Sequence, residues 1–176
     1  MRLHFRELVM LTACIACQAA PPPLEVVEEV DLESYTGSWY EIASFPQRFQ
    51  QGCVATKATY TRREDGRIRV ENECRDKSFD GDLRRIEGVA WLTDPSTSQA
   101  KLKVRFFWPF TGNYWILELD PEYQYAVVGA PSRKYLWILS RTRTIEPSLY
   151  QTLLSRIEAH GFDRSRLQLT RQPPSP

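Results

Sequence analysis

The sequence predicts an all-β protein: eight antiparallel strands in an up-and-down barrel, then an α-helix packed outside and a short ninth strand. Three observations support this fold class. Short segments rich in aromatic and β-branched residues recur at regular spacing, and turn residues separate them. Charged and apolar side chains alternate along several of these segments, as in a wall with one solvated face. A helical apolar stripe follows near the C-terminus.

The 176 residues suit a single domain. Residues 46–52 are expected to form a loop at the open end of the barrel, and Glu64-Asp65-Gly66 a tight hairpin turn. Eight antiparallel strands closed on themselves leave no edge and an interior wide enough for one small ligand. The predicted strands are 39–45, 53–61, 67–75, 84–92, 101–107, 113–119, 123–129 and 135–140.

The helix is predicted from Pro147, which fits a first turn, to Gly161, which fits a C-terminal cap. Arg156 and Glu158 interrupt it and it is too short to span a membrane, so we expect it to pack on the outside of the barrel. Residues 167–169 are predicted to form the ninth strand. The apolar face of the helix is Leu149, Tyr150, Leu153, Leu154 and Ile157.

Charged residues identify the inner face of each strand, because successive side chains alternate between the two faces. With Glu118 in water, for example, Trp115 and Leu117 are expected inside. The seventh strand carries no charge, and Tyr125 is assigned inward without that cue.

Small residues on the predicted inner face favour an open interior. Gly88 and Ala90 are small where a packed core would prefer bulk, which favours an apolar slot for a long acyl chain over a filled barrel. Asn72, Tyr60 and Tyr125 are expected to orient a polar head group. The predicted ligand-binding residues are Thr56, Ala58, Tyr60, Val70, Asn72, Gly88, Ala90, Val104, Phe106, Trp115, Leu117, Tyr125 and Trp137.

Composition argues against several other functions. The 23 basic and 22 acidic residues give no electrostatic reason to expect nucleic acid binding. Of the two histidines, His4 lies in the leader and His160 at a predicted helix end, where a cation suits the helix dipole. The chain therefore lacks the parts of a Ser-His-Asp triad or a zinc site, and it has no phosphate-binding glycine loop. We predict no catalytic residues, no metal and no cofactor.

The N-terminus is predicted to be a short export signal, with Arg2 and Arg6 before an apolar run. Its end, Leu11-Thr12-Ala13-Cys14, resembles the bacterial lipobox, so Cys14 is predicted to be lipidated and to hold the chain on a membrane. Lipidation of Cys17 and an ordinary signal cut near Ala20 are the alternatives. The predicted division is a signal peptide at 1–13, a lipidated N-terminus and proline-rich tether at 14–30, the barrel domain at 31–171 and a disordered tail at 172–176.

Cys53 and Cys74 lie almost opposite each other on neighbouring predicted strands. Export makes a disulfide between them reasonable. Perfect alternation would put the two side chains on opposite faces, so the bridge requires a bulge or a frayed strand end near Gly52.

Two segments carry a family resemblance: Gly37-Ser38-Trp39-Tyr40-Glu41-Ile42-Ala43 at the first strand and Tyr135-Leu136-Trp137-Ile138-Leu139-Ser140-Arg141 at the eighth. A Gly-x-Trp opening and a late strand that ends in Arg resemble the lipocalin family. The resemblance implies that Gly37, Trp39 and Arg141 are a structural signature, with the guanidinium stacked on the indole to close the barrel floor. It extends from about Asp31 to Leu169. Phe106-Phe107 and Pro109-Phe110 are similar to the bacterial outer-membrane lipoprotein subgroup, which is apolipoprotein D-like.

This resemblance implies an outer-membrane lipoprotein that holds fatty acids or lysophospholipids in its barrel for envelope lipid storage, transport or repair. Ile15 after Cys14 implies sorting to the outer membrane, on its periplasmic face or at the cell surface. The oligomeric state is left undecided, with a homodimer as one possibility. A tetrapyrrole, a retinoid or a quinone would also suit an aromatic slot. The alternatives are an enzyme on the same scaffold, which a free cysteine inside the barrel would favour, and a protein-interaction lipoprotein with a filled barrel.

Overall fold

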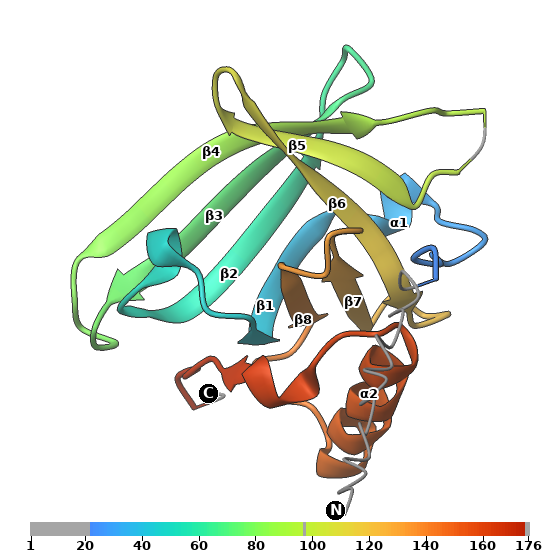
Figure 1. Cartoon of the computed structure of the whole chain (residues 1–176). Coiled ribbons are helices and arrows are strands. Elements are labelled where there is room, and N and C mark those ends of the chain that lie inside the picture. Colours follow the sequence, from blue (N-terminus) through green and yellow to red (C-terminus); the bar gives the residue numbers. More distant parts are fainter. Residues whose placement is uncertain (1–21, 97, 175–176) are drawn as a thin grey trace, which may run out of the picture.

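The computed structural model describes residues 22–96 and 98–174, and its strands form one antiparallel sheet that closes into a barrel (Figure 1). Each strand from β2 to β7 pairs with the next one along the chain, β8 pairs with β1, and β1 pairs with β2. The predicted eight-stranded barrel is therefore confirmed. The barrel strands are β1 (Gly37–Ser44), β2 (Cys53–Arg62), β3 (Ile68–Asp76), β4 (Leu83–Leu92), β5 (Lys101–Phe107), β6 (Phe110–Leu119), β7 (Tyr125–Gly129) and β8 (Leu136–Ser140).

The strand bounds shift by a few residues from the predicted ones, and the shifts of β6 and β7 have clear local reasons. β6 begins earlier than predicted because Phe107 and Phe110 still pair across a turn that contains the cis Trp108-Pro109 bond. β7 begins later because the Tyr123 amide donates to the Asp120 carbonyl at 2.8 Å and closes a turn there.

Helix α2 (Pro147–Ala159) lies outside the barrel, as predicted (Figure 1). Pro147 occupies its first turn, and Gly161 follows its C-terminal end with φ at +80°. Leu153 and Ile157 are fully buried against the barrel wall. Within the described residues, no helix combines the length and the apolar character that crossing a membrane requires.

Three short helical segments gave no recognisable sequence pattern, because one turn is too short to show helical periodicity. They are α1 (Leu32–Tyr35), η1 (Arg48–Gln50) and η2 (Arg164–Arg166). Asp31 caps α1, since its carboxylate accepts the Glu33 amide at 3.0 Å.

The C-terminal segment fills a gap between β1 and β2. These strands pair only from Gly37 with Tyr60 to Tyr40 with Lys57. Beyond that point β9 (Gln168–Leu169) pairs with β1, and the Arg171 carbonyl accepts the Ala55 amide of β2 at 2.8 Å. The sequence predicts a disordered tail from residue 172, whereas the Gln172 side chain donates to β1 and β2 carbonyls at 2.9 Å each.

Apolar side chains gather in two clusters, one inside the barrel and one between the wall and α2. Trp115, Leu117 and Tyr125 belong to the outer cluster, so their predicted inward orientation is wrong. In β6 the register shifts between Ile116 and Glu118, and this bulge at Leu117 reverses the alternation that was counted back from Glu118.

The correct inner residues on these two strands are Tyr114 and Ile116 of β6 and Ala126 and Val128 of β7. β7 carries no charged side chain to identify its faces, which explains why the inner side of that strand was assigned incorrectly. The leader and the first part of the tether, residues 14–21 with Cys14 and Cys17, lie outside the described residues.

Candidate functional site

The floor of the barrel is closed by Arg141 over Trp39. The guanidinium carbon lies 3.9 Å from the indole ring centroid. Arg141 also donates to the carbonyls of Ser34 at 2.9 Å and Ser38 at 3.0 Å, and burial lowers its pKa. Gly37 has φ at +93°, and a Cβ there would stand 3.2 Å from the guanidinium. The predicted stacking of the Arg141 guanidinium on the Trp39 indole is therefore present in the structure.

Three tyrosines fill the space directly above this floor. The Tyr114 hydroxyl lies 2.7 Å from that of Tyr35 and 2.8 Å from that of Tyr60. Burial raises the pKa of Tyr60 to about 12 and those of the other two well above their usual range, so all three stay neutral. The enclosed cavity beside them measures about 10 Å³, which is room for roughly one water.

The three tyrosine hydroxyls together have one hydrogen-bond donor more than their contacts with each other use. Three hydroxyls carry three hydrogens, and the two contacts between them use only two, so one donor is left over. Tyr35 and Tyr114 were missed from the sequence, the first because α1 gave no pattern and the second because of the β6 bulge.

The inner wall above the floor is continuous across β2 to β5. The strand register places Asn72 beside Ala58, and Val70 between Tyr60 and Gly88. Inner side chains near the floor, such as Ile68 and Leu102, are buried, whereas Val104, Phe106 and Trp137 are only partly buried. Because the wall itself is a closed sheet, water reaches these side chains through the mouth. The residues predicted for the site that the structure brings together on this surface are Thr56, Ala58, Tyr60, Val70, Asn72, Gly88, Ala90, Val104, Phe106 and Trp137.

Gly88 does not leave the empty space that its size suggests. A Cβ on this residue would stand 2.6 Å from Cδ1 of Phe106, so the Phe106 ring occupies the room that the missing side chain provides. Gly88 therefore leaves room for the Phe106 ring to pack against β4, and that ring narrows the interior of the barrel.

A buried carboxylate lies on the inner wall at β1. Glu41 pairs with the inner residue Leu139 of β8 and is 6% exposed. Its oxygens accept from Ser44 Oγ at 3.0 Å, from Gln50 Nε2 at 2.8 Å and from Thr170 Oγ1. No Lys, Arg or His forms an ion pair with it in the described part of the chain.

Several buried polar side-chain atoms in this part of the barrel have no hydrogen-bond partner. Gln172 Nε2 donates to the backbone carbonyls of Glu41 and Thr56, so the backbones of these two residues lie on either side of it. Buried oxygens without a donor are Thr56 Oγ1, Asn72 Oδ1, Gln50 Oε1 and Gln172 Oε1, and the amide of Gln47 is unpaired at both ends. Glu41 was missed from the sequence, although it shares the alternation of Trp39 and so should face inward.

The β1–β2 loop is held at the mouth from several sides. Arg84 of β4 donates to the carbonyls of Phe49 at 3.1 Å and Gln51 at 3.0 Å. Cys53 and Cys74 form the predicted disulfide. The bulge that this bridge required is present, because the β2–β3 register shifts between Val54 and Lys57.

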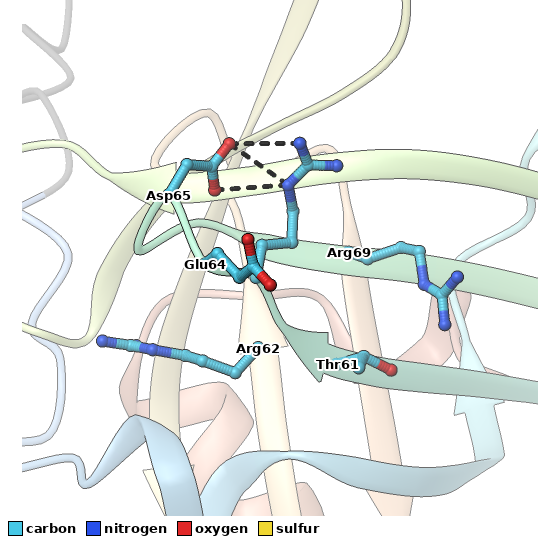
Figure 2. A pocket seen from close by; sticks show the side chains of 6 residues that line it. Thr61, Arg62, Glu64, Asp65 and Arg69 are labelled. Carbon is cyan, nitrogen blue, oxygen red and sulfur yellow. Dashed lines mark hydrogen bonds and ion pairs between the residues drawn. The ribbon is translucent and has the colours of Figure 1, made fainter.

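A second hollow of about 470 Å³ lies outside the barrel at the β2–β3 turn, and it is wide open (Figure 2). Arg62, Arg69 and Glu64 line it, together with an Arg63–Asp65 ion pair at 3.1 Å. Its charged, exposed walls do not suit an acyl chain. No group of three or more metal-ligating side chains occurs in the described residues.

Comparison with known proteins gives one family. Residues 30–172 match the lipocalin-like domain. Temperature-induced lipocalin-1 of Arabidopsis thaliana is 47% identical, over 87% of this chain and 85% of its own length. Outer membrane lipoprotein Blc of Escherichia coli K12 is 42% identical, over 92% of this chain and 91% of its own. The solved structure of insecticyanin from Manduca sexta superposes with a TM-score of 0.68 at 23% identity, covering 88% and 87%. The chain belongs to the lipocalin family.

Proposed function

We propose that this protein is a lipid-binding outer-membrane lipoprotein that carries one acyl chain in the upper half of its barrel, for envelope lipid storage, transport or repair. The observation that carries the proposal is the inner wall toward the mouth, where apolar side chains stay partly exposed inside a closed sheet. Covering them with an acyl chain contributes about 0.8 kcal/mol per buried methylene before costs. The tyrosines above the floor limit the ligand to the space above them.

The polar groups of the wall favour a lysophospholipid over a fatty acid. Glu41 is a buried carboxylate, and the amide oxygens of Gln50 and Gln172, whose nitrogens donate to Glu41, are buried acceptors without a partner. A fatty acid would bring a second carboxylate towards these acceptors, whereas the hydroxyl or ammonium of a lysophospholipid head brings donors. We therefore expect the head group to lie toward Glu41, Thr56 and Asn72.

Attachment to the outer membrane is proposed from the lipobox-like Leu11-Thr12-Ala13-Cys14 and from the relatives named outer membrane lipoprotein. Mass spectrometry of the purified protein tests it. A chain that begins at Cys14 with acyl groups supports the anchor, and Cys14→Ser should abolish acylation while Cys17→Ser leaves it intact. Acylation that persists in Cys14→Ser would exclude this site.

A binding role is proposed in preference to catalysis. The two cysteines of the barrel are joined to each other, so neither is a free nucleophile in the interior. Titration of thiols in the oxidised protein gives a direct check, because two reactive thiols in the barrel would reopen the case for an enzyme.

The binding test compares two adjacent residues of β2. Ala58→Trp adds bulk to the inner wall, and Thr59→Trp adds the same side chain to the outer face. With lysophospholipid titrated against tryptophan fluorescence, we expect Ala58→Trp to weaken binding at least about tenfold and Thr59→Trp to leave it unchanged. Equal affinities in both variants, or a purified barrel that neither carries nor binds lipid, would refute the proposal.

A further inference from the structure

Exposed apolar side chains gather at the open end of the barrel. Among the described residues, seven large apolar side chains are exposed: six lie in loops or strand ends around the mouth, and the seventh, Leu169 on β9, pairs with Ala43 near the mouth end of β1. The six are Phe49, Leu83, Phe107, Trp108, Phe110 and Tyr135. A soluble surface rarely concentrates such side chains without a partner.

The β5–β6 turn contributes the most exposed part, which we call the aromatic tip (Phe107, Trp108, Pro109 and Phe110). Phe107 is 65% exposed, Trp108 83% and Phe110 76%. The turn joins the ends of β5 and β6 that lie away from the Trp39 floor (Figure 1). Tryptophan and other aromatic side chains concentrate where proteins meet the interface of a lipid bilayer.

The strand behind the aromatic tip carries positive charge. Between Asp94 and Glu118 the sequence holds Lys101, Lys103 and Arg105 and no carboxylate. Lys101 begins β5 at its floor end, whereas Lys103 and Arg105 lie closer to the aromatic tip, and the Arg105 guanidinium carbon lies 5.5 Å from the Trp91 ring centroid. None of the three cations forms an ion pair in the described residues. Cations beside apolar aromatic groups complement an anionic lipid surface.

The start of the described chain is held at the same end of the barrel. Arg133, in the loop between β7 and β8, donates to the Pro22 carbonyl at 2.7 Å. Seven residues lie between Cys14 and Pro22, which makes eight residue steps along the chain. At full extension they reach roughly 28 Å, so an acylated Cys14 keeps the mouth close to the membrane.

We infer that the mouth of the barrel docks on an anionic phospholipid surface through the aromatic tip. This inference rests on the proposed lipid-binding function and adds the surface from which the ligand is taken. An acyl chain would then move between bilayer and barrel with little exposure to water.

Tryptophan quenching in reconstituted vesicles tests the inference. The purified lipoprotein is placed in vesicles of phosphatidylglycerol and phosphatidylcholine, part of which carries brominated acyl chains. We expect bromine to quench the emission of the natural protein, and Trp108→Phe to lose most of that quenching. Trp91→Phe, which changes a tryptophan on the outer wall, should retain it. Equal quenching in all three proteins would overturn the inference.

Ligand transfer gives a second and functional measurement. Phe107→Ser/Trp108→Ser/Phe110→Ser should slow the transfer of a fluorescent lysophospholipid from vesicles, while its affinity for the detergent-solubilised protein stays unchanged. Trp91→Ser, on the outer wall near the floor end of β4, should transfer at the natural rate. Lys103→Gln should weaken the dependence of transfer on anionic lipid by on the order of fivefold.

These readouts separate the inference from the proposed function. Normal lysophospholipid binding with unchanged transfer in the triple variant would refute docking and leave the binding function in place. Absence of binding in the natural protein would refute the binding function itself. If the aromatic tip is instead an interface with a second copy, the natural protein is dimeric, the triple variant is monomeric, and bromine quenches neither, which also overturns the inference.

Discussion

The ring of Phe106 lies against Gly88 on the neighbouring strand, where a Cβ would stand 2.6 Å from the ring Cδ1. A small residue on an inner wall therefore does not by itself create space for a ligand. At this position it creates space for another side chain of the protein.

Gly88→Ala should destabilise the protein by about 1–3 kcal/mol, because the added methyl forces the Phe106 ring or the β5 backbone to move. Urea unfolding followed by circular dichroism measures this change. Phe106→Ala removes the ring, so Gly88→Ala should cost much less in that background than in the natural protein. Equal costs in the two backgrounds would show that the two residues do not share this space.

Thr56→Val should raise the free energy of unfolding by up to about 1 kcal/mol, because it replaces a buried hydroxyl that has no partner with a methyl of similar size. The same change should weaken lysophospholipid binding if the hydroxyl contacts the head group. Parallel unfolding and titration experiments measure both effects. Thr59→Val on the outer face is the control, and greater stability with unchanged affinity would remove Thr56 from the site.

Glu41→Gln should narrow the preference for lysophospholipid over a fatty acid of equal chain length, because the carboxylate that repels the fatty acid is removed. Competition of each lipid for one bound fluorescent probe gives the ratio of affinities. Glu87→Gln, on the exposed face of β4, should preserve the natural ratio. A ratio that is the same in all three proteins would show that Glu41 only holds the Gln50 and Thr170 side chains in place.

The contact between β6 and α2 should lose stability in acid. Burial alone would raise the pKa of Glu118, but hydrogen bonds from His160 at 2.8 Å and Arg156 at 2.9 Å outweigh it and hold that pKa below its usual value. A carboxylate with a lowered pKa in the folded state stabilises the protein above its unfolded pKa, and this contribution is lost as the pH falls through the folded pKa.

Urea unfolding of the natural protein and Glu118→Gln between pH 6 and pH 3, a range that spans about the ordinary carboxyl pKa, tests this contact. We expect the difference in unfolding free energy between the two proteins to shrink as the pH falls. Glu158→Gln, at an exposed ion pair with Arg164, should show a smaller difference throughout. A pH-independent difference for Glu118→Gln would contradict the assigned protonation.

Reduction of the disulfide should lower the free energy of unfolding by about 3 kcal/mol, since Cys53 and Cys74 close a loop with a sequence separation of 21. Urea unfolding with and without dithiothreitol measures it, and Cys53→Ser/Cys74→Ser, which reductant cannot affect, is the control. A loss in the natural protein far below this value would show that Arg84 and the β2–β3 pairing already fix this part of the chain.

Sequence patterns predicted the strands and the helix, because alternation, turn residues and helical periodicity are local signals. The Trp39–Arg141 floor came from the resemblance to the lipocalin family, and the disulfide from the hairpin register and the expected export. Most of the inner wall on β2 to β5 was also predictable, since charges alternate regularly there. The bulge at Leu117 was not, because an extra residue in one strand depends on the partner strand. Glu41 was missed because only the structure shows that its donors come from a distant loop and from the C-terminal segment.

The C-terminal segment completes the barrel wall between β1 and β2, two strands from the N-terminal half of the chain. As the chain is synthesised, β1 and β2 emerge first, yet their seam stays incomplete until residues 168 to 172 have followed. The barrel wall between β1 and β2 therefore closes only when these C-terminal residues have paired with both strands. A purification tag or truncation placed there would alter the seam itself, whereas an extension before residue 22 would leave it whole.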